Sequence, residues 1–236
     1  GKTTLMRMVN AMVTPTSGTV FVRNQDVSGE DPVRLRRSIG YVPQEGGLFP
    51  HRTVADNVAT VPRLEGASKA ESRERALELL ALVGLDVEMA DRYPAQLSGG
   101  QRQRVGVARA LANHADILLM DEPFGALDPI VRADLQRELK EIQRALGTTI
   151  LFVTHDVDEA FTLGDQVAVL STGGHIEQVG TPAELLSSPA SPFVAEFVGA
   201  SRAARPVHLE SSDGLIVDEA GTPVGTLTSD EAGERP

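Results

Sequence analysis

The chain has 236 residues, of which 41% are hydrophobic and none is cysteine, and its formal net charge at pH 7 is -11. Enough apolar residues are present to bury a sizeable core, which excludes a wholly disordered chain. The lack of cysteine excludes disulfides, thiolate metal sites and a cysteine nucleophile. The acidic excess argues against nucleic acid as a partner, because duplex binding depends on Lys and Arg.

The first residues, Gly-Lys-Thr-Thr at positions 1–4, match the last third of a glycine-rich phosphate loop, G-x-x-x-x-G-K-[ST]. In such a loop, backbone N–H groups and the start of the following helix hold phosphate groups. Leu5, Met8, Val9 and Met12 recur at helical spacing and therefore predict that helix.

Two short strands are predicted next, at residues 19–23 and 38–43, and the turn-rich residues 44–50 are predicted to form a loop. Ser68 and Glu71 then form a capping-box pattern, which opens a helix that extends through residue 83. The buried face of this helix is expected to carry Leu77, Leu80 and Val83.

Leu-Ser-Gly-Gly-Gln at residues 97–101 is a second capping-box pattern, and the helix that it opens has an apolar side of Val105, Ala108, Leu111 and Ala112. In a chain of this length the pentapeptide arises by chance on the order of once in ten thousand. An ordinary helix cap does not require two glycines. Here they leave bare N–H groups at a helix N-terminus, where the helix dipole favours an anion, so the motif predicts a phosphate-binding turn.

A continuous apolar run at residues 117–120 ends in an Asp-Glu pair and is typical of a strand buried on both faces. A helix at residues 132–146, a strand at 149–153 and a helix at 158–163 are predicted to follow. This alternation of strands and helices predicts a parallel sheet that is covered on both sides.

The last part of the chain is predicted to be organised differently. Residues 167–170 and 175–179 predict a hairpin, and residue 181 begins another capped helix. After about Gly199 the composition shifts to Ser, Gly, Pro, Asp and Glu, which predicts a boundary. Residues 215–228 allow two interpretations, a solvated acidic tail, which we favour, or two short strands similar to the strand pair of a CBS module.

Polar residues follow the predicted strands at Gln44, Asp121, Glu122 and His155. Ligands bind at this end of the strands in open parallel sheets. Each residue taken singly also has a structural interpretation: Gln44 as a solvated loop residue, the acidic pair as helix N-terminal charges, and His155 as a surface or core histidine.

Taken together and in this order, the motifs resemble the nucleotide-binding domain of an ABC transporter. The resemblance covers residues 1–199, and residues 47–62 look most like the ATPases of osmoprotectant importers for glycine betaine and choline. It implies an α/β fold, that of a P-loop NTPase with a mainly parallel sheet flanked by helices. An inserted helical subdomain is expected at about residues 45–113, and a short C-terminal tail at residues 200–236.

The same resemblance implies ATP and Mg2+ as cofactors. Gly1, Lys2 and Thr4 are expected to contact the phosphates, with Lys2 neutralising the β and γ groups. Thr3 and Asp121 are expected to hold Mg2+, Thr3 through its hydroxyl and Asp121 through water, because a hard cation prefers oxygen ligands.

The chemistry of hydrolysis is expected to rest on three further residues. Glu122 is the implied general base toward the attacking water, and Gln44 positions both this water and the metal. His155 is expected to contact the γ-phosphate. Most of the acceleration is then expected from positioning and charge stabilisation rather than from covalent chemistry.

A second set of residues is implied to act across a homodimer. The turn at residues 97–101 closes over ATP held by the opposite subunit, and Asp128 crosses the same interface. The members of the turn that are expected to contact this nucleotide are Ser98, Gly99, Gly100 and Gln101.

The expected function is that of an ATP-hydrolysing subunit that powers an importer for glycine betaine, choline or a related compatible solute. The implied partners are transmembrane permease subunits and, indirectly, a solute-binding protein, and the implied location is cytoplasmic, at the inner face of the membrane. Two alternatives stay open, a soluble ABC ATPase acting on ribosomes or DNA, and a non-catalytic truncated remnant.

The front of the chain departs from the family pattern. Family members place a strand, an adenine-stacking aromatic residue and the first loop glycines ahead of the position of Gly1. We therefore expect the start to be a fragment boundary, and we expect apolar neighbours of the missing strand to be exposed and ATP binding to be weakened.

Overall fold

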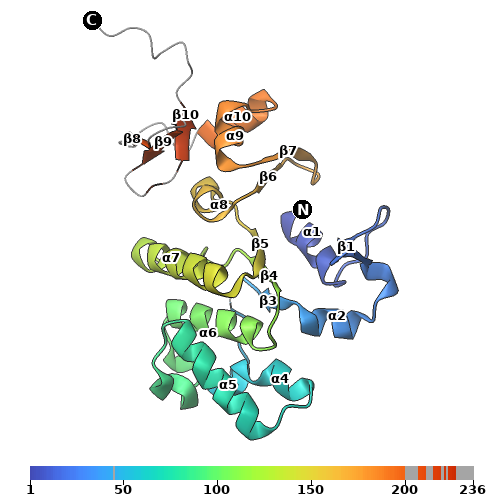
Figure 1. The fold of residues 1–236 in the computed structure, drawn as a ribbon, viewed down its shortest axis with the longest axis vertical. Helices are drawn as coiled ribbons and strands as arrows, with labels where there is room; N and C mark the ends of the chain where they lie inside the picture. Colours follow the sequence, from blue (N-terminus) through green and yellow to red (C-terminus); the bar gives the residue numbers. More distant parts are fainter. Residues whose placement is uncertain (45, 200–206, 211–214, 219–220, 222, 227–236) are drawn as a thin grey trace, which may run out of the picture. The chain divides into compact units, whose positions relative to one another are not determined.

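The computed structural model describes residues 1–44, 46–199, 207–210, 215–218, 221 and 223–226 (Figure 1). The chain divides into two compact units, which are described separately. Residues 2–153 form the larger unit, and Gly1 together with residues 154–236 forms the smaller unit.

A three-stranded parallel sheet is the centre of the larger unit. Its strands are β3 (Gly40–Val42), β4 (Ile117–Asp121) and β5 (Thr149–Val153), in the order β3-β4-β5. The register places Leu118 of β4 beside Ile150 of β5. The apolar Ile-Leu-Leu-Met run forms the middle strand, and Leu118, Leu119 and Met120 are buried, which confirms the prediction of a strand buried on both faces.

Helices and short turns make up the rest of the larger unit. In chain order its helices are α1 (Lys2–Val9), α2 (Pro32–Ser38), α3 (Val54–Val58), α4 (Thr60–Leu64), α5 (Lys69–Leu82), α6 (Gly99–Leu111) and α7 (Pro129–Leu146). The remaining elements are the 3-10 helices η1 (Val27–Gly29), η2 (Val87–Asp91) and η3 (Pro94–Gln96) and the antiparallel pair β1 (Phe21–Val22) and β2 (Gln25–Asp26). Between residues 46 and 113 the described chain is therefore mainly helical, as predicted.

Most of these α-helices begin after a residue whose side chain accepts a hydrogen bond from an N–H of the first turn. These N-cap residues, which open α2, α3, α5, α6 and α7, are Asp31, Thr53, Ser68, Ser98 and Asp128. The local sequence thus fixes where a helix starts, and the apolar positions that follow fix which face it buries.

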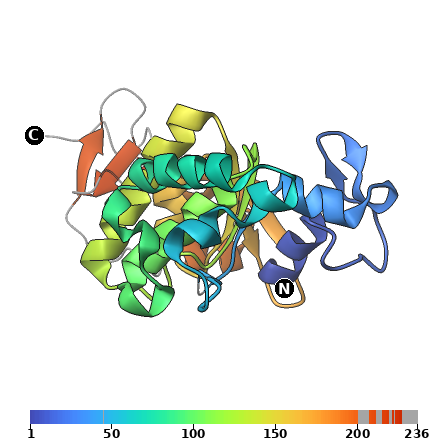
Figure 2. The same ribbon diagram turned by 90° about the horizontal axis from the view of Figure 1, so that it is seen from below.

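The two faces of β4 pack against different helices. Leu119 packs with Met6 of α1 in a buried cluster, whereas Met120 lines a hollow together with residues of α6 and α7. Figures 1 and 2 accordingly show α1 and the α6–α7 pair on different sides of the sheet. Since side chains alternate along a strand, Asp121 shares the α1 side with Leu119.

The smaller unit contains α8 (Val157–Leu163), the antiparallel pair β6 (Val167–Leu170) and β7 (Ile176–Gly180), α9 (Pro182–Ser187) and α10 (Pro192–Gly199). Val157, Phe161 and Leu185 belong to its buried apolar cluster. A second antiparallel sheet follows, in the order β10-β9-β8, formed by β8 (Val207–Glu210), β9 (Leu215–Asp218) and β10 (Pro223–Thr226).

The tail therefore differs from the favoured prediction of a solvated acidic segment. Its central strand β9 buries Val217, and a third strand, β8, was not predicted. Residues 219–220, 222 and 227–228 of the alternative strand pair lie outside the described residues. The boundary expected near Gly199 stays a prediction, since residues 200–206 are also outside them.

Several element predictions need correction. α1 ends at Val9 and buries Met6, while Leu5 and Met12 are exposed. The buried face of α5 carries Leu79 rather than Leu77, which is half-buried. The predicted strand 19–23 shrinks to the two residues of β1, and α2 and β2 were not predicted. α7 begins at Pro129, three residues before the predicted start, because Asp128 caps it.

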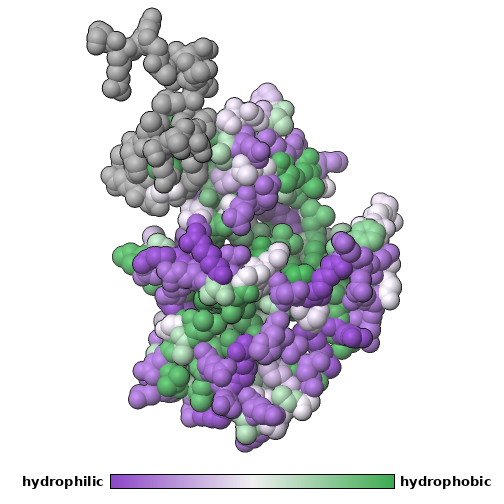
Figure 3. All heavy atoms as spheres, in the orientation of Figure 1, coloured by the Kyte–Doolittle hydropathy of each residue, from purple (hydrophilic) through white to green (hydrophobic). Residues whose placement is uncertain are grey.

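No helix among the described residues is long and apolar enough to cross a membrane. On the face of the molecule drawn in Figure 3, apolar side chains gather in separate patches between polar ones.

Candidate active site

Thr3 and Asp121 come together at the end of the middle strand. The Thr3 hydroxyl donates a hydrogen bond to Asp121 Oδ1, with 2.9 Å between the oxygens. Thr3 lies in the first turn of α1, and Asp121 is the last residue of β4 and is 5% exposed. Arg7, one turn further along α1, places its guanidinium 3.9 Å from Asp121 Oδ2. The sequence motifs did not single out Arg7, although its spacing of four residues from Thr3 places both on one helix face.

Gln44 and Glu122 form a second pair next to the first. Gln44 Nε2 donates to Glu122 Oε2 at 3.2 Å, and the Glu122 N–H continues the ladder between β4 and β5 by donating to Val153 O at 2.9 Å. Glu122 has a φ of +45°. A non-glycine residue in this region is strained, and such residues cluster at functional sites. We call Thr3–Asp121 and Gln44–Glu122 the strand-end pairs.

The strand-end pairs offer oxygen ligands of the kind that Mg2+ prefers. The Thr3 hydroxyl and the Asp121 carboxylate are in contact, and the Gln44 amide lies on the neighbouring glutamate. Among the described residues, no group of three or more His, Cys, Asp or Glu side chains could hold a metal by itself. Protein sites hold Mg2+ through one or two carboxylates while phosphate and water oxygens complete its octahedron, and the buried Asp121 carboxylate beside the Thr3 hydroxyl fits this pattern.

The remaining residues of the phosphate-loop motif lie at the start of α1. Lys2 is half-buried and is the first residue of the helix, and Thr4 is exposed. Gly1 is exposed and belongs to the smaller unit. The start of α1 is thus available to an anion from Lys2 onward.

The turn at residues 97–101, which we call the signature turn, has the predicted capping box. The Gln101 N–H donates to Ser98 Oγ at 3.2 Å, and the Ser98 N–H donates to Gln101 Oε1 at 2.9 Å. Ser98 is exposed, Gly99 half-buried and Gly100 buried. A Cβ at Gly100 would lie only 2.7 Å from Val131 Cγ1 of α7.

Asp128 lies beside the signature turn. It caps α7 by accepting a hydrogen bond from the Val131 N–H at 3.1 Å. A Cβ at Gly99 would lie 3.5 Å from a methyl carbon of Leu127, the residue just before Asp128. The structure therefore brings two motifs together that are separated in sequence, and both stand at helix N-termini.

His155 lies in the smaller unit, directly after β5. It is exposed, in the turn between Thr154 and Asp156. Thr154 Oγ1 accepts from the Asp156 N–H at 3.0 Å and donates to Glu159 Oε2 at 2.6 Å. The turn that carries His155 is therefore fixed by hydrogen bonds within the unit.

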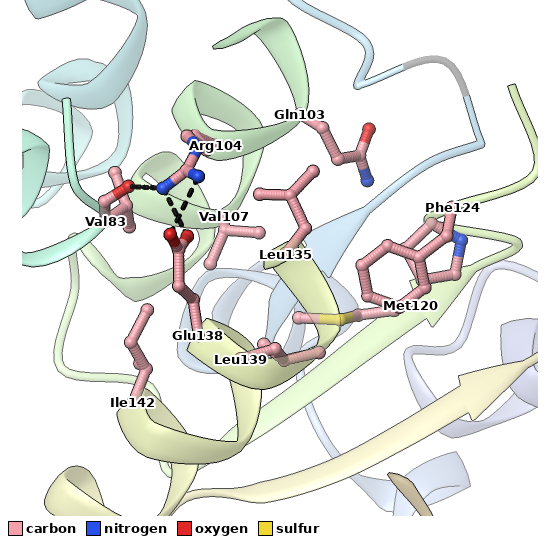
Figure 4. A pocket seen from close by; sticks show the side chains of 11 residues that line it. Val83, Gln103, Arg104, Val107, Met120, Phe124, Leu135, Glu138, Leu139 and Ile142 are labelled. Atoms are coloured by element: carbon pink, nitrogen blue, oxygen red, sulfur yellow. Dashed lines mark hydrogen bonds and ion pairs between the residues drawn. The ribbon is translucent and has the colours of Figure 1, made fainter. Parts of the chain in front are cut away.

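An apolar hollow of about 340 Å3, open space at its mouth included, lies between β4, α6 and α7 (Figure 4). Phe124 and Leu135 line it, and Arg104 and Glu138 form an ion pair at its side, where Arg104 also donates to Val83 O. No member of the strand-end pairs lines this hollow. Its apolar lining does not suit a polyanionic ligand.

Four features together define the fold of an ATP-binding cassette. They are the parallel sheet, the last residues of a phosphate loop before α1, the strand-end pairs and the signature turn. A sequence model of the family described as "ABC transporter" matches residues 1–125. The chain therefore belongs to the ABC transporter family.

Within this family, the chain is similar to ATP-binding proteins of transporters for carnitine, glycine betaine and choline. The chain is 53% identical over 202 residues to the carnitine transport ATP-binding protein OpuCA of Listeria monocytogenes, covering 86% of this chain and 51% of that protein. It is 54% identical over 202 residues to the glycine betaine/carnitine/choline transport ATP-binding protein OpuCA of Bacillus subtilis, covering 86% and 53%. The chain thus spans about half the length of these curated relatives.

Solved structures support the fold. The dimeric post-hydrolysis structure of the ATP-binding cassette MJ0796 with ADP and Pi superposes with a TM-score of 0.68 and 36% sequence identity. The match covers 77% of this chain and 80% of that one.

Proposed function

We propose that this chain binds ATP with Mg2+, hydrolyses it between two copies of itself, and thereby powers import of glycine betaine, choline or a related compatible solute. The observation that carries the proposal is the meeting of the strand-end pairs at the end of β4. They place a hydroxyl, an amide and two carboxylates where the phosphates of a nucleotide held at the start of α1 would end.

In this proposal the start of α1 holds the triphosphate. Gly1 and Thr4 contact phosphate oxygens, and Lys2 neutralises the β and γ groups. Thr3 through its hydroxyl, Asp121 through water and Gln44 would hold the metal, which would supply charge stabilisation on the phosphate oxygens. The hydrogen bond from Thr3 to Asp121 keeps both oxygen ligands in one place before the nucleotide arrives.

Glu122 is the proposed general base. Its carboxylate takes a proton from water, whose oxygen attacks the γ-phosphorus, and the bond between the γ-phosphorus and the β–γ bridging oxygen breaks to release ADP and phosphate. The hydrogen bond from Gln44 Nε2 orients that carboxylate. His155 is proposed to contact the γ-phosphate from the turn after β5.

The signature turn is proposed to bind the ATP of the opposite subunit. The N–H groups of Gly99 and Gly100 lie in the first turn of α6, where they have no partner within the helix and can donate to phosphate. Ser98, Gln101 and Asp128 lie beside them. The dimeric state of the related cassette structure supports this arrangement.

The solute class and the partners are proposed from the relatives. Those reported above are named as transport ATP-binding proteins for carnitine, glycine betaine and choline. We infer that the chain works with a transmembrane permease at the inner face of the membrane, and that a solute-binding protein delivers the solute to that permease.

Glu122→Gln tests the catalytic assignment. We would measure ATP hydrolysis by the full-length protein. The amide cannot accept the proton, so kcat should fall about 1,000-fold while ATP still binds and holds a stable dimer. Glu78→Gln, the same change at an exposed glutamate of α5, is the matched control and should leave kcat unchanged. Undiminished hydrolysis by Glu122→Gln would remove Glu122 from this role.

The transport assignment needs a different experiment. The full-length protein would be reconstituted in proteoliposomes with candidate permease and solute-binding proteins from the same organism. ATP hydrolysis should rise when glycine betaine or choline is supplied, and it should not respond to an equal concentration of sulfate. A protein that purifies with ribosomes and shows no response to any quaternary amine would contradict the importer proposal.

A further inference from the structure

Arg109 of α6 holds the loop that follows Gln44. Its guanidinium donates from Nη2 to Gly46 O at 2.8 Å and from Nη1 to Gly47 O at 2.7 Å. Both glycines have positive φ angles, +71° and +56°. This backbone conformation, which only glycine adopts without strain, turns two consecutive carbonyls toward one side chain.

The environment of Arg109 indicates that its shape matters as well as its charge. Burial lowers the pKa of the guanidinium, which lies 6.0 Å from the centroid of the Phe49 ring. A planar guanidinium can grip two carbonyls and also face a ring, whereas a lysine ammonium is a point charge without that fork. The loop also packs closely on α6, because a Cβ at Gly106 would lie 3.3 Å from Gly46 O.

The far end of the same loop is fixed to α3. Asn57 is fully buried, and its Nδ2 donates to Phe49 O, Arg52 O and Thr53 O at 3.1, 3.2 and 2.9 Å. Its Oδ1 accepts from the Phe49 N–H at 2.7 Å. The described loop residues 46–53 are therefore hydrogen-bonded to α6 through Arg109 and to α3 through Asn57.

Gln44 lies only two positions before the first anchored glycine, and α6 begins at the signature turn. We propose that Arg109 is a positioning residue that sets the Gln44 amide against Glu122 according to the position of α6. A shift of α6 when the signature turn binds nucleotide would then be passed through Arg109 and the loop to Gln44, and so to Glu122. This inference rests on the proposed function, because it concerns the rate at which Glu122 acts.

The test is a double-mutant cycle with Gln44→Ala in the full-length protein. Arg109→Lys should lower kcat about 10-fold and leave KM for ATP within about 2-fold, since a small displacement of a catalytic group slows chemistry without touching the phosphate loop. In the Gln44→Ala background the same change should lower kcat by less than about 2-fold, because Arg109 acts through Gln44.

Arg104→Lys is the matched control on the same helix. Arg104 also donates to a backbone carbonyl, Val83 O at 2.7 Å, and it pairs with Glu138 on α7, but it does not touch the loop. Thermal unfolding should report comparable losses for the two variants, while only Arg109→Lys slows kcat. Phe49→Leu, which removes the ring from beside the guanidinium, gives a second and milder variant if Arg109→Lys folds poorly, with kcat expected to fall about 2-fold to 3-fold.

Each outcome decides the inference. Equal kcat losses in Arg104→Lys and Arg109→Lys would make the effect one of general stability and overturn it. Additive losses with Gln44→Ala would also overturn it, because Arg109 would then act by another route. If the unsubstituted protein did not hydrolyse ATP, the proposed function would fail before any Arg109 variant was compared, which keeps the two failures distinguishable.

Discussion

The two halves of the candidate site are built in opposite ways. The strand-end pairs join residues that are 118 and 78 positions apart, so they exist only once the sheet of the larger unit has formed. The signature turn is closed within four residues by two hydrogen bonds between Ser98 and Gln101. Substitutions in the first half should therefore change chemistry at nearly constant stability, and substitutions in the second half should change packing and stability as well.

Thr3→Val tests whether a substitution in the strand-end pairs acts on chemistry rather than on stability. Valine keeps the shape of threonine and is similarly β-branched, so α1 should be little affected, but it removes the donor to Asp121 Oδ1. We expect kcat to fall about 100-fold with thermal unfolding nearly unchanged. Thr3→Ser keeps the hydroxyl and should retain kcat within about 3-fold. Full kcat in Thr3→Val would show that the hydrogen bond to Asp121 is not needed for hydrolysis.

Gly100→Ala tests the packing side of the contrast. The added Cβ would lie 2.7 Å from Val131 Cγ1, so α6 and α7 must separate, and overpacking of this kind lowers the free energy of unfolding by about 1–3 kcal/mol. Adding Val131→Ala removes the clashing methyl groups and should recover most of this loss. The measurement is chemical denaturation of the single and double variants.

Gly99→Ala is the control for that experiment. Its Cβ would meet a methyl carbon of Leu127 at 3.5 Å, an ordinary contact, so the free energy of unfolding should not fall. Any loss of hydrolysis in Gly99→Ala would then reflect the nucleotide of the partner subunit. If Gly99→Ala and Gly100→Ala were equally unstable, close approach to Val131 would not be the reason that Gly100 is a glycine.

What could be predicted from the sequence follows the same division. The capping boxes at Ser98 and Ser68 were predicted down to the residues that exchange hydrogen bonds, because all their partners lie within one helical turn. The middle strand was also predictable, since an apolar run that ends in Asp121 and Glu122 reflects burial on both faces. The positions of Gln44, Asp121 and Glu122 directly after predicted strands, in turn, placed these residues at one end of the sheet.

Contacts between distant segments could not be predicted in this way. Arg7 beside Asp121 and Arg109 on the carbonyls of the loop are ordinary arginines in the sequence, and only the packing of α1 and α6 against the sheet gives them partners. The strand β8 was missed for a related reason. Its pairing with β9 depends on register rather than on local preference, and β-strands are stabilised largely by such neighbours.

Ser98→Ala should have a smaller effect that falls on stability. It removes the acceptor for the Gln101 N–H, which costs about 1 kcal/mol of unfolding free energy at a helix N-cap. Ser68→Ala, at the capping box of α5 with the same 3.2 Å acceptor distance, should cost a similar amount. Chemical denaturation measures both changes. A much larger loss at Ser98 would mean that the signature turn is held by more than its own capping box.

The two capping boxes should differ in how their contribution to stability depends on pH, and this is the smallest effect that we expect. In α5 the partner of Ser68 is Glu71, and hydrogen bonds from the Ser68 hydroxyl and N–H hold the pKa of its carboxyl below the 4.5 of a free glutamate. Because the folded-state pKa is the lower one, this contribution to stability is present above pH 4.5 and is lost as the pH falls through the folded-state value. In α6 the partner is Gln101, which does not titrate in this range.

Glu71→Gln gives α5 the same capping box as α6 and isolates the pH effect. The unfolding free energies of the wild-type chain and of Glu71→Gln, measured from about pH 6 down to about pH 3, should converge as the wild-type carboxylate is protonated. An NMR titration of Glu71 should give a midpoint below 4.5. A midpoint above it would mean that the Ser68 hydrogen bonds do not favour the carboxylate. A glutamine in the signature turn thus keeps its geometry independent of pH, which suits the phosphate-binding role that we propose for this turn.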